Sequence, residues 1–241
     1  MKVAIITGGT RGIGAAVSSL LLNGREKWHV ISVSKNSPPV IARDDKAIRY
    51  ITADLGIAES IDYVVHEIKN TVDRVDLLLN NAGAIAEADS YQNIDDYAAV
   101  SSYRLHCVSP LLLAKGLQSL IEHGENSSIV NVGSVYGSIA DVDVAAYTMA
   151  KSAIPIMTKL MAKAFAPKVR VNCVLPGHVD TDMTKSAPKE FVDSVIRKTL
   201  LKRLASADEI AEVICFIASS SSRFITGASI LVDGGYILSE H

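Results

Sequence analysis

Three polar side chains in the middle of the chain have the types and spacing of an acid–base site. Tyr147 and Lys151 are four residues apart in a segment with helical periodicity, so both project from one helix face. Ser134 follows the apolar run 128–133, which places its hydroxyl at the carboxyl end of an expected strand. An ammonium group beside a phenol favours the phenolate, so Lys151 should lower the pKa of Tyr147. Together the three groups predict a site that binds a carbonyl oxygen and transfers a proton.

The Tyr147–Lys151 pair is a weak signal when it is taken alone. On most helices such a pair is a half-buried tyrosine beside a solvated lysine. Its interpretation as a catalytic pair therefore depends on the segments that surround it in the sequence.

A glycine-rich turn follows the first apolar run of the chain. Residues 7–14 read Thr-Gly-Gly-Thr-Arg-Gly-Ile-Gly and lead directly into helical periodicity. Glycines let the backbone turn tightly and approach a pyrophosphate, while the helix amino terminus offers free N–H groups. Such a turn can also simply join a strand to a helix, but its strand–turn–helix context favours a dinucleotide site. The residues expected at the pyrophosphate are Gly8, Thr10, Arg11, Gly12, Ile13 and Gly14.

The position that distinguishes NAD from NADP lies about twenty residues after such a turn, and NAD-binding proteins usually carry an acidic residue there. This chain has Ser34 and Lys35 instead. A hydroxyl and an ammonium suit a 2′-phosphate, and Arg11 could add a second cation. The sequence therefore predicts NADP as the cofactor, the alternative being that Lys35 and Arg11 are solvated surface charges.

Strand-like and helix-like segments alternate along the whole chain. The strand-like runs are 3–6, 29–33, 48–52, 77–79, 129–132, 169–174 and 229–232. The segments with helical spacing are 12–24, 60–71, 94–122, 147–166 and 207–218. This alternation predicts an α/β fold, a doubly wound parallel sheet with helices on both faces and ligands at the carboxyl ends of the strands. Because no linker, repeat or low-complexity stretch is present, we expect one domain over residues 1–241.

The composition narrows the possible partners and the compartment. Apolar residues make up 49% of the chain, charged residues 21%, and the net charge is −2, which favours a well-buried protein without nucleic-acid partners. The cysteines Cys107, Cys173 and Cys215 lie far apart in apolar runs, so neither disulfides nor a metal site is expected. Since the first residues have a strand pattern and no apolar run reaches membrane-spanning length, we expect a cytoplasmic protein. Surface turns are expected at 37–39 and 126–128.

Taken together, the motifs resemble those of the short-chain dehydrogenase/reductase family. They are the glycine turn, Asn80-Asn81-Ala82-Gly83, Ser134, Tyr147-x-x-x-Lys151, Pro176-Gly177, Ile225-Thr226-Gly227-Ala228 and Val232-Asp233-Gly234-Gly235. The resemblance spans nearly the whole chain and implies a Rossmann-type fold with about seven strands. It also implies hydride transfer between a nicotinamide and an alcohol or carbonyl carbon. Within the family the chain is most similar to 3-oxoacyl-(acyl carrier protein) reductases, which makes an NADPH-dependent carbonyl reductase the leading interpretation.

The resemblance also implies roles for individual residues. Ser134 would hydrogen-bond the substrate oxygen, Tyr147 would donate the proton, and Lys151 would bind the nicotinamide ribose. Asp54 and Leu55, after the third expected strand, match the family positions at the adenine. The other positions expected at the cofactor are Asn80, Ala82, Gly83, Pro176, Gly177, Val179 and Thr181.

The chain departs from the family pattern at two positions. His106 stands where the family has an asparagine that is thought to hold a water in a proton relay to the lysine. Neutral imidazole can also donate and accept, so His106 either preserves the relay or is a satisfied histidine on an inward helix face. Pro155 lies four residues after Lys151 and has no N–H for the Lys151 carbonyl, so the helix is expected to bend or to admit water there.

The segment 183–205 matches the variable substrate lid of the family. It holds six basic residues against two acidic ones, which suits an acidic, carrier-bound partner or is simply the solvated face of a helix. The family resemblance further implies a homotetramer that pairs the long helical segments 94–122 and 147–166. Two other functions stay open: an alcohol, sugar or steroid dehydrogenase with the same residues, and an NADP-binding sensor without turnover.

Overall fold

Seven strands form one parallel sheet. The computed structural model describes residues 1–36 and 47–239 of the chain. The strand order is β3-β2-β1-β4-β5-β6-β7, and every neighbouring pair is parallel. The strands are β1 (Lys2–Thr7), β2 (Trp28–Ser34), β3 (Ile48–Thr52), β4 (Leu77–Asn80), β5 (Ser128–Val132), β6 (Arg170–Pro176) and β7 (Ser229–Val232). Because the winding direction reverses between β1 and β4, a crevice opens outside their carboxyl ends.

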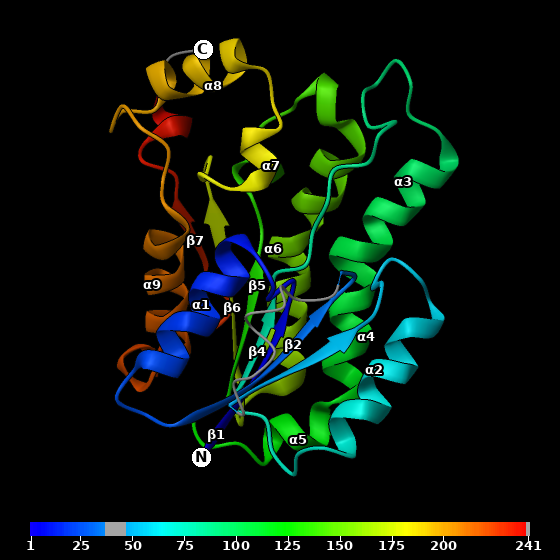
Figure 1. The fold of residues 1–241 in the computed structure, drawn as a ribbon, viewed down its shortest axis with the longest axis vertical. Helices are drawn as coiled ribbons and strands as arrows, with labels where there is room; N and C mark the ends of the chain where they lie inside the picture. Colours follow the sequence, from blue (N-terminus) through cyan, green and yellow to red (C-terminus); the bar gives the residue numbers. More distant parts are fainter. Residues whose placement is uncertain (37–46, 240–241) are drawn as a thin grey trace.

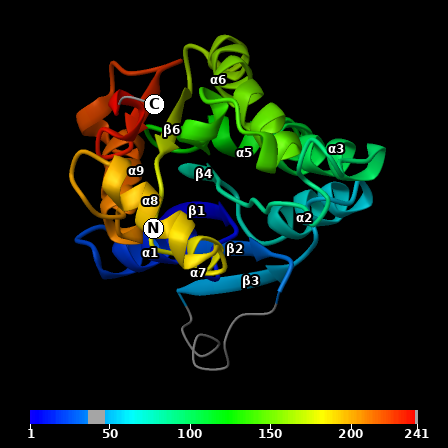
Figure 2. The same ribbon diagram turned by 90° about the horizontal axis from the view of Figure 1, so that it is seen from above.

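Helices cover both faces of the sheet (Figure 1). One face carries α1 (Gly12–Asn23) and α9 (Ala207–Ala218). The other face carries α2 (Glu59–Lys69), α4 (Ser109–Gly116), α5 (Gln118–Glu122) and α6 (Ala145–Phe165). Figure 2 shows the two layers on opposite sides of the strands, with α3 (Asp96–Tyr103) outside the second one. Two further helices, α7 (Asp182–Lys185) and α8 (Lys189–Lys198), lie beyond the carboxyl end of β6.

The core explains why the strands read as continuous apolar runs. In β1, Val3 and Ile5 pack into the core beneath α2, α4 and α6, whereas Ala4 and Ile6 pack beneath α1 and α9. Side chains on both faces of the strand are buried, so neither face can carry polar residues over the length of the strand. The predicted Rossmann-type doubly wound fold is confirmed. Within the described residues, no helix combines the length and the apolar character needed to cross a membrane.

The predicted helical segment 94–122 is helical over most of its length but is not one uniform α-helix. The structure instead has α3, a π-helical turn (Arg104–Val108), α4 and α5, with a break at Leu117. The N–H of Ser109 bonds the carbonyl of Arg104 five residues back, and the next residue, Pro110, has no N–H to offer. This wider turn is the segment that carries His106, and π-turns of this kind often occur at functional sites.

The two predicted surface turns have different outcomes. Residues 37–39 lie outside the described part of the chain. At 126–128 the prediction is wrong beyond Asn126, whose φ of 56° is typical of a turn, because Ser128 is fully buried and already begins β5.

Helix α6 continues through Pro155 without interruption. The carbonyl of Lys151, which Pro155 cannot serve with an N–H, lies against Gly137, where a Cβ atom would stand 2.8 Å from that oxygen. Gly137 belongs to the 3-10 turn Val135–Gly137 that follows Ser134. The absence of a side chain at Gly137 therefore lets this turn pack directly against the helix that carries Tyr147 and Lys151.

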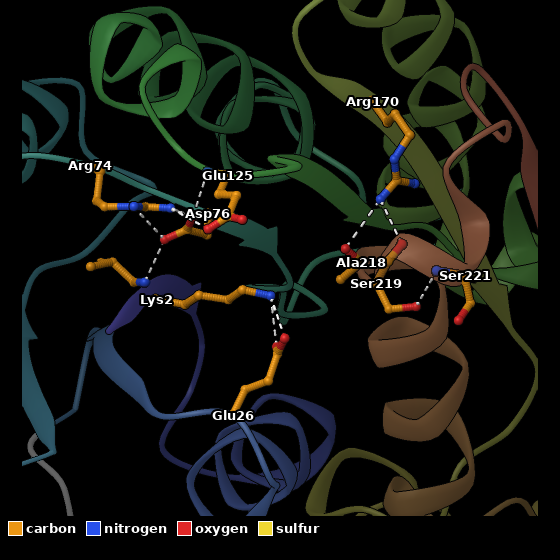
Figure 3. A network of polar contacts seen from close by, with 10 residues as sticks. Lys2, Glu26, Arg74, Asp76, Glu125, Arg170, Ala218, Ser219 and Ser221 are labelled. Atoms are coloured by element: carbon orange, nitrogen blue, oxygen red, sulfur yellow. Dashed lines mark hydrogen bonds and ion pairs between the residues drawn. The ribbon is translucent and has the colours of Figure 1, made fainter.

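Buried polar contacts fix the opposite, amino-terminal edge of the sheet (Figure 3). The carboxylate of Asp76 accepts hydrogen bonds from the backbone N–H groups of Val3 (2.8 Å) and Glu125 (2.7 Å) and pairs with Arg74. At the start of β6, the guanidinium of Arg170 donates to carbonyl oxygens at the end of α9, including Ala218 at 3.1 Å. These contacts satisfy helix-end carbonyls and strand-end amides, and they leave the carboxyl edge for the functional site.

Candidate functional site

The glycine turn between β1 and α1 has the geometry of a phosphate cradle. Gly8 and Gly12 have φ values of 68° and 53°, which side chains rarely adopt, and a Cβ on Gly14 would stand 2.3 Å from the Gly8 carbonyl oxygen. The side-chain amide of Asn81 donates to the carbonyls of Thr7 (3.0 Å) and Gly8 (3.2 Å), which holds the turn against the end of β4. Arg11, the N-cap residue of α1, makes no side-chain capping bond within the described residues, which leaves the first N–H groups of the helix available to an anion.

One cleft of about 660 Å³ runs along the carboxyl ends of the strands. Most of the residues predicted from the sequence line it: Gly8, Thr10, Arg11, Gly12, Ile13, Ser34, Lys35, Asp54, Leu55, Ala82, Gly83, Ser134, Tyr147, Lys151, Pro176, Gly177, Val179 and Thr181. Three of the predicted residues do not line the cleft: Gly14, Asn80 and His106. Gly14 packs under the glycine turn, as described above.

Asn80 is expected at the cofactor, and this stays a prediction, although Asn80 does not line the cleft. Its side chain is buried in the sheet, where its amide donates to Asn131 at 2.8 Å. The neighbouring Asn81 lines the cleft instead. Successive side chains of a strand point in opposite directions, so the Asn80-Asn81 pair could supply only one residue to this edge.

Ser134, Tyr147 and Lys151 meet in the middle of the cleft, and each is more than nine-tenths buried. Ser134 stands just after β5, where its hydroxyl accepts the backbone N–H of Tyr136 at 3.2 Å and is close enough to Tyr147 to influence the pKa of the phenol. The ammonium nitrogen of Lys151 lies 5.4 Å from the centre of the Tyr147 ring. It donates to the carbonyl oxygen of Val132 at 2.9 Å, which anchors the long side chain on β5. A hydroxyl, a phenol and an ammonium therefore converge on one point.

Burial changes the acidity of both α6 side chains. Burial raises the pKa of Tyr147 to about 12, while its hydrogen bond with Ser134 acts in the opposite direction. The lowering of this pKa by Lys151 stays a prediction, because burial is the largest influence on the phenol and the charge of Asp89 acts in the same direction as burial. Burial also lowers the pKa of Lys151 to about 8. At neutral pH the phenol keeps its proton, as a proton donor must.

Asp89 positions the start of α6, a role that the sequence did not reveal. It is buried, and its carboxylate accepts the backbone N–H of Tyr147 at 3.0 Å. Its carbonyl accepts the N–H of Ala145 at 2.7 Å. Asp89 lies in a loop without a recognisable motif, so only the fold brings it to this helix end.

His106 lies behind the cleft wall, beside the catalytic pair. Its Nδ1 is 2.9 Å from the carbonyl oxygen of Ser102, which can only accept, so Nδ1 carries the proton. Its Nε2 is buried and has no hydrogen-bond partner among the described residues. The ring meets Tyr147 edge to face at 5.3 Å, and a Cβ on Gly83 would stand 3.0 Å from Nε2. Burial, aided by the Lys151 charge, lowers the pKa of His106 to about 3. His106 is thus uncharged, and its Nε2 is a hydrogen-bond acceptor to which no described residue donates.

The residues expected at the 2′-phosphate, Ser34, Lys35 and Arg11, all line the cleft. The hydroxyl of Ser34 is buried and has no partner within residues 1–36 and 47–239. Lys35 forms an ion pair with Asp54 at 2.9 Å, and Arg11 lies 3.8 Å from Asp182. Both cations face carboxylates, so a bound phosphate would have to compete for them.

The basic residues of the predicted lid do not face the cleft. None of the six lines it. Lys185 lies 3.4 Å from Asp180, and Arg203 pairs with Glu209 at 2.6 Å. The segment instead presents Met183, Thr184, Ala187, Pro188 and Phe191 to the cleft. This arrangement favours the interpretation of these charges as a solvated helix face.

Comparisons with known proteins agree with this geometry. A family model described as enoyl-(acyl carrier protein) reductase matches residues 8–237. The 3-oxoacyl-(acyl-carrier-protein) reductase FabG of Haemophilus influenzae is 30% identical over 99% of both chains. The crystal structure of a short-chain dehydrogenase family protein from Francisella tularensis is 32% identical, with a TM-score of 0.87 over 99% of this chain and 100% of that one. A 4-hydroxyisoleucine dehydrogenase complexed with NADH is 27% identical, with a TM-score of 0.90 over the full length of both chains.

The depressed pKa of Lys151 predicts a pH-dependent effect on stability. The usual lysine value is 10.5 and the folded value is about 8. Below pH 8 the side chain is charged in both states, so folding bears the full cost of burying the charge. Between these values only the unfolded state stays protonated, and that cost disappears as the pH rises. Lys151→Met removes the cost of burying this charge at every pH. The difference in unfolding free energy between the variant and the native protein should therefore shrink by roughly 2 kcal/mol between pH 7 and pH 9.5.

Urea denaturation of both proteins at the two pH values measures this change. Lys159→Met, at an exposed position of the same helix, is the control and should show a pH-independent difference. A pH-independent difference for Lys151→Met as well would show that its ammonium is not perturbed by burial.

Proposed function

The chain belongs to the short-chain dehydrogenase/reductase family of oxidoreductases, and on this premise we propose that it is an NADPH-dependent carbonyl reductase. It would reduce a ketone, of the 3-oxoacyl thioester type or another, to an alcohol. The observation that carries the proposal is the convergence of Ser134, Tyr147 and Lys151 inside the cleft.

The residues of the cleft fit a nicotinamide dinucleotide. The glycine turn leaves room for a pyrophosphate at the free amino terminus of α1, and the unpartnered hydroxyl of Ser34 suits the adenosine end. Lys35 and Arg11 would hold a 2′-phosphate, and Asp54 and Leu55 would lie at the adenine. Val179 and Thr181 would orient the carboxamide, and Lys151 would hold the nicotinamide ribose. When bound, the cofactor supplies the hydride.

The protein's own part in the reaction is to bind and to protonate. Ser134 donates a hydrogen bond that holds the carbonyl oxygen beside Tyr147. Tyr147 then gives its proton to that oxygen as negative charge develops there. The Lys151 ammonium, fixed on the Val132 carbonyl, stabilises the phenolate that remains. Burial of all three side chains excludes water and strengthens these interactions.

We further propose that His106 takes part in restoring the proton. Its Nε2 is an acceptor with a fixed tautomer, it is buried, and it needs a hydrogen donor. Lys151 is close enough to lower its pKa, so a donor between the two side chains would connect them. A satisfied core histidine would not leave Nε2 without a partner.

The assembly and the location remain proposals. Exposed apolar side chains on α4 and α6, among them Leu112, Ile156 and Leu160, suit the pairing of these helices in a homotetramer. A cytoplasmic location and a carrier-bound substrate are likewise predictions from the sequence and the family. A sugar, alcohol or steroid dehydrogenase would use the same three residues, and only the substrate wall distinguishes these functions.

Tyr147→Phe tests whether the protein is an enzyme. Loss of the phenolic proton should reduce ketone turnover by a factor of about 10² or more. NADPH binding, followed by fluorescence titration, should persist, because the aromatic ring remains. Tyr63→Phe, at an exposed position on α2, is the control and should keep its activity. Unchanged turnover in Tyr147→Phe would contradict the proposed mechanism, and binding without any turnover in the native protein would favour a sensor.

The cofactor preference tests the assignment of Ser34, Lys35 and Arg11. We expect kcat/KM to be at least about tenfold higher with NADPH than with NADH, since a charged hydrogen bond to phosphate is worth that much. Lys35→Ala should reduce this ratio, whereas Lys27→Ala, at an exposed position before β2, should not. A clear preference for NADH in the native protein would overturn the assignment.

Two substitutions at His106 separate the relay from simple packing. Asn can still accept through its side-chain oxygen, so His106→Asn should keep much of the activity. His106→Ala should lower kcat by about tenfold or more and alter its pH profile. The exposed His66→Ala serves as the control. An Ala variant with unchanged kcat and pH profile would remove His106 from the mechanism.

A further inference from the structure

Aromatic rings form one wall of the cleft beside Tyr147. The ring of Tyr136 lies 6.2 Å from that of Tyr147, and His178 lies 5.5 Å from Tyr136. Phe191, from α8, continues the wall 5.6 Å beyond His178. All four side chains line the cleft, so a substrate whose carbonyl reaches Tyr147 has its remaining part against these rings.

Two carboxylates stand beside this wall. Asp141 and Asp143, in the short segment between Ser134 and α6, line the same cleft. A carboxylate oxygen of Asp141 accepts the backbone N–H of Asp143 at 2.9 Å, which fixes its orientation. The negative charge of Asp141 raises the pKa of the Tyr136 phenol, second only to burial, so the carboxylate acts on the wall itself. Within the described residues neither carboxylate forms an ion pair.

No cation balances the two carboxylates in the described part of this wall. Burial lowers the pKa of His178 to about 4, so this imidazole is neutral at physiological pH. Its Nε2 is buried without a partner among residues 1–36 and 47–239, which leaves a polar atom of the wall for a bound molecule. Arg11, the cation that lines the cleft near α7, already faces Asp182. The Lys151 ammonium lies 5.4 Å from the centre of the Tyr147 ring and is held by the carbonyl oxygen of Val132.

We infer that the enzyme selects ketones that carry a positively charged ammonium group several atoms from the carbonyl. Carboxylates attract such a charge, and the faces of Tyr136 and Phe191 accept it through cation–π contact. The same carboxylates repel substrates with a carboxylate or a phosphate in this position. The inference rests on the proposed reductase function and narrows its substrate class.

Three ketones of similar size test this selection. In 1,1-dimethyl-4-oxopiperidinium the charge is permanent, and 4,4-dimethylcyclohexanone is its neutral isostere. The third, 4-oxocyclohexanecarboxylate, carries a negative charge. With saturating NADPH, kcat/KM should fall in the order cation, neutral ketone, anion. Because a nearby charge also makes the carbonyl more electrophilic, the decisive quantity is how the cation-to-neutral ratio changes in variants.

Asp141→Asn should lower the cation-to-neutral ratio of kcat/KM by about tenfold, as expected for one charge removed near a partly solvated site. Asp143→Asn, at an exposed position, is a second variant that does not depend on the packing around Asp141. The control is Asp193→Asn, an exposed carboxylate of α8 outside the cleft, which should leave the ratio unchanged.

The outcomes separate this inference from the proposed function. A ratio that is unchanged in both cleft variants, while all three ketones are still reduced, would overturn the charge selection and leave the reductase intact. Charge selection would also be overturned, and the reductase function left intact, if the anion or a neutral polyhydroxy ketone such as dihydroxyacetone were reduced better than the cation. Failure to reduce any ketone would overturn the proposed function and the inference with it. A fall in the ratio confined to Asp141→Asn and Asp143→Asn would support both.

Discussion

The hydrogen bond from the Lys151 ammonium to the Val132 carbonyl is the contact on which the geometry of the site depends. It joins α6 to the carboxyl end of β5 at 2.9 Å, inside the protein, where an unpaired charge would be costly. Because Tyr147 is one helical turn before Lys151, the same contact sets the height of the phenol above the sheet. Asp89 holds the first turn of α6 by the N–H of Tyr147, so the helix is fixed at two points. These two contacts hold the helix that carries the phenol against the sheet and the loop around Asp89.

Burial has different consequences for the three titratable side chains beside this contact. It keeps Tyr147 protonated, it lowers the pKa of Lys151 towards neutrality, and it keeps His106 uncharged. A phenol that keeps its proton, an ammonium with a lowered pKa and an uncharged imidazole therefore lie side by side. The outer part of the cleft is different, since Asp141 and Asp143 keep a negative potential beside the aromatic wall. The proposed chemistry and the proposed selection of substrate would therefore depend on separate groups of residues.

Much of this arrangement could be predicted from the sequence. Apolar runs located all seven strands, because a sheet buried on both faces needs apolar residues throughout. The glycine turn and the Tyr147–Lys151 spacing could be read because their geometry depends on local backbone rules. The direction in which the pKa of Tyr147 is shifted could not be predicted, since the shift results from burial by residues distant in the chain. The roles of Asp89 and Asn81 could not be predicted for the same reason. The π-turn at His106 could not be predicted either, because its i+5 hydrogen bonding leaves no periodic pattern of apolar residues in the sequence.

The close packing at Gly137 has a consequence for how this protein can change. Any side chain there would collide with the main-chain oxygen of Lys151, a backbone atom that cannot rotate away. Residue 137 is thereby closed to substitution, whereas Tyr136, Asp141 and Phe191 expose their side chains to the cleft and stand clear of that oxygen. Laboratory evolution of substrate range can therefore begin at Asp141 and Phe191, whereas Tyr136 also contacts the ring of the proton donor.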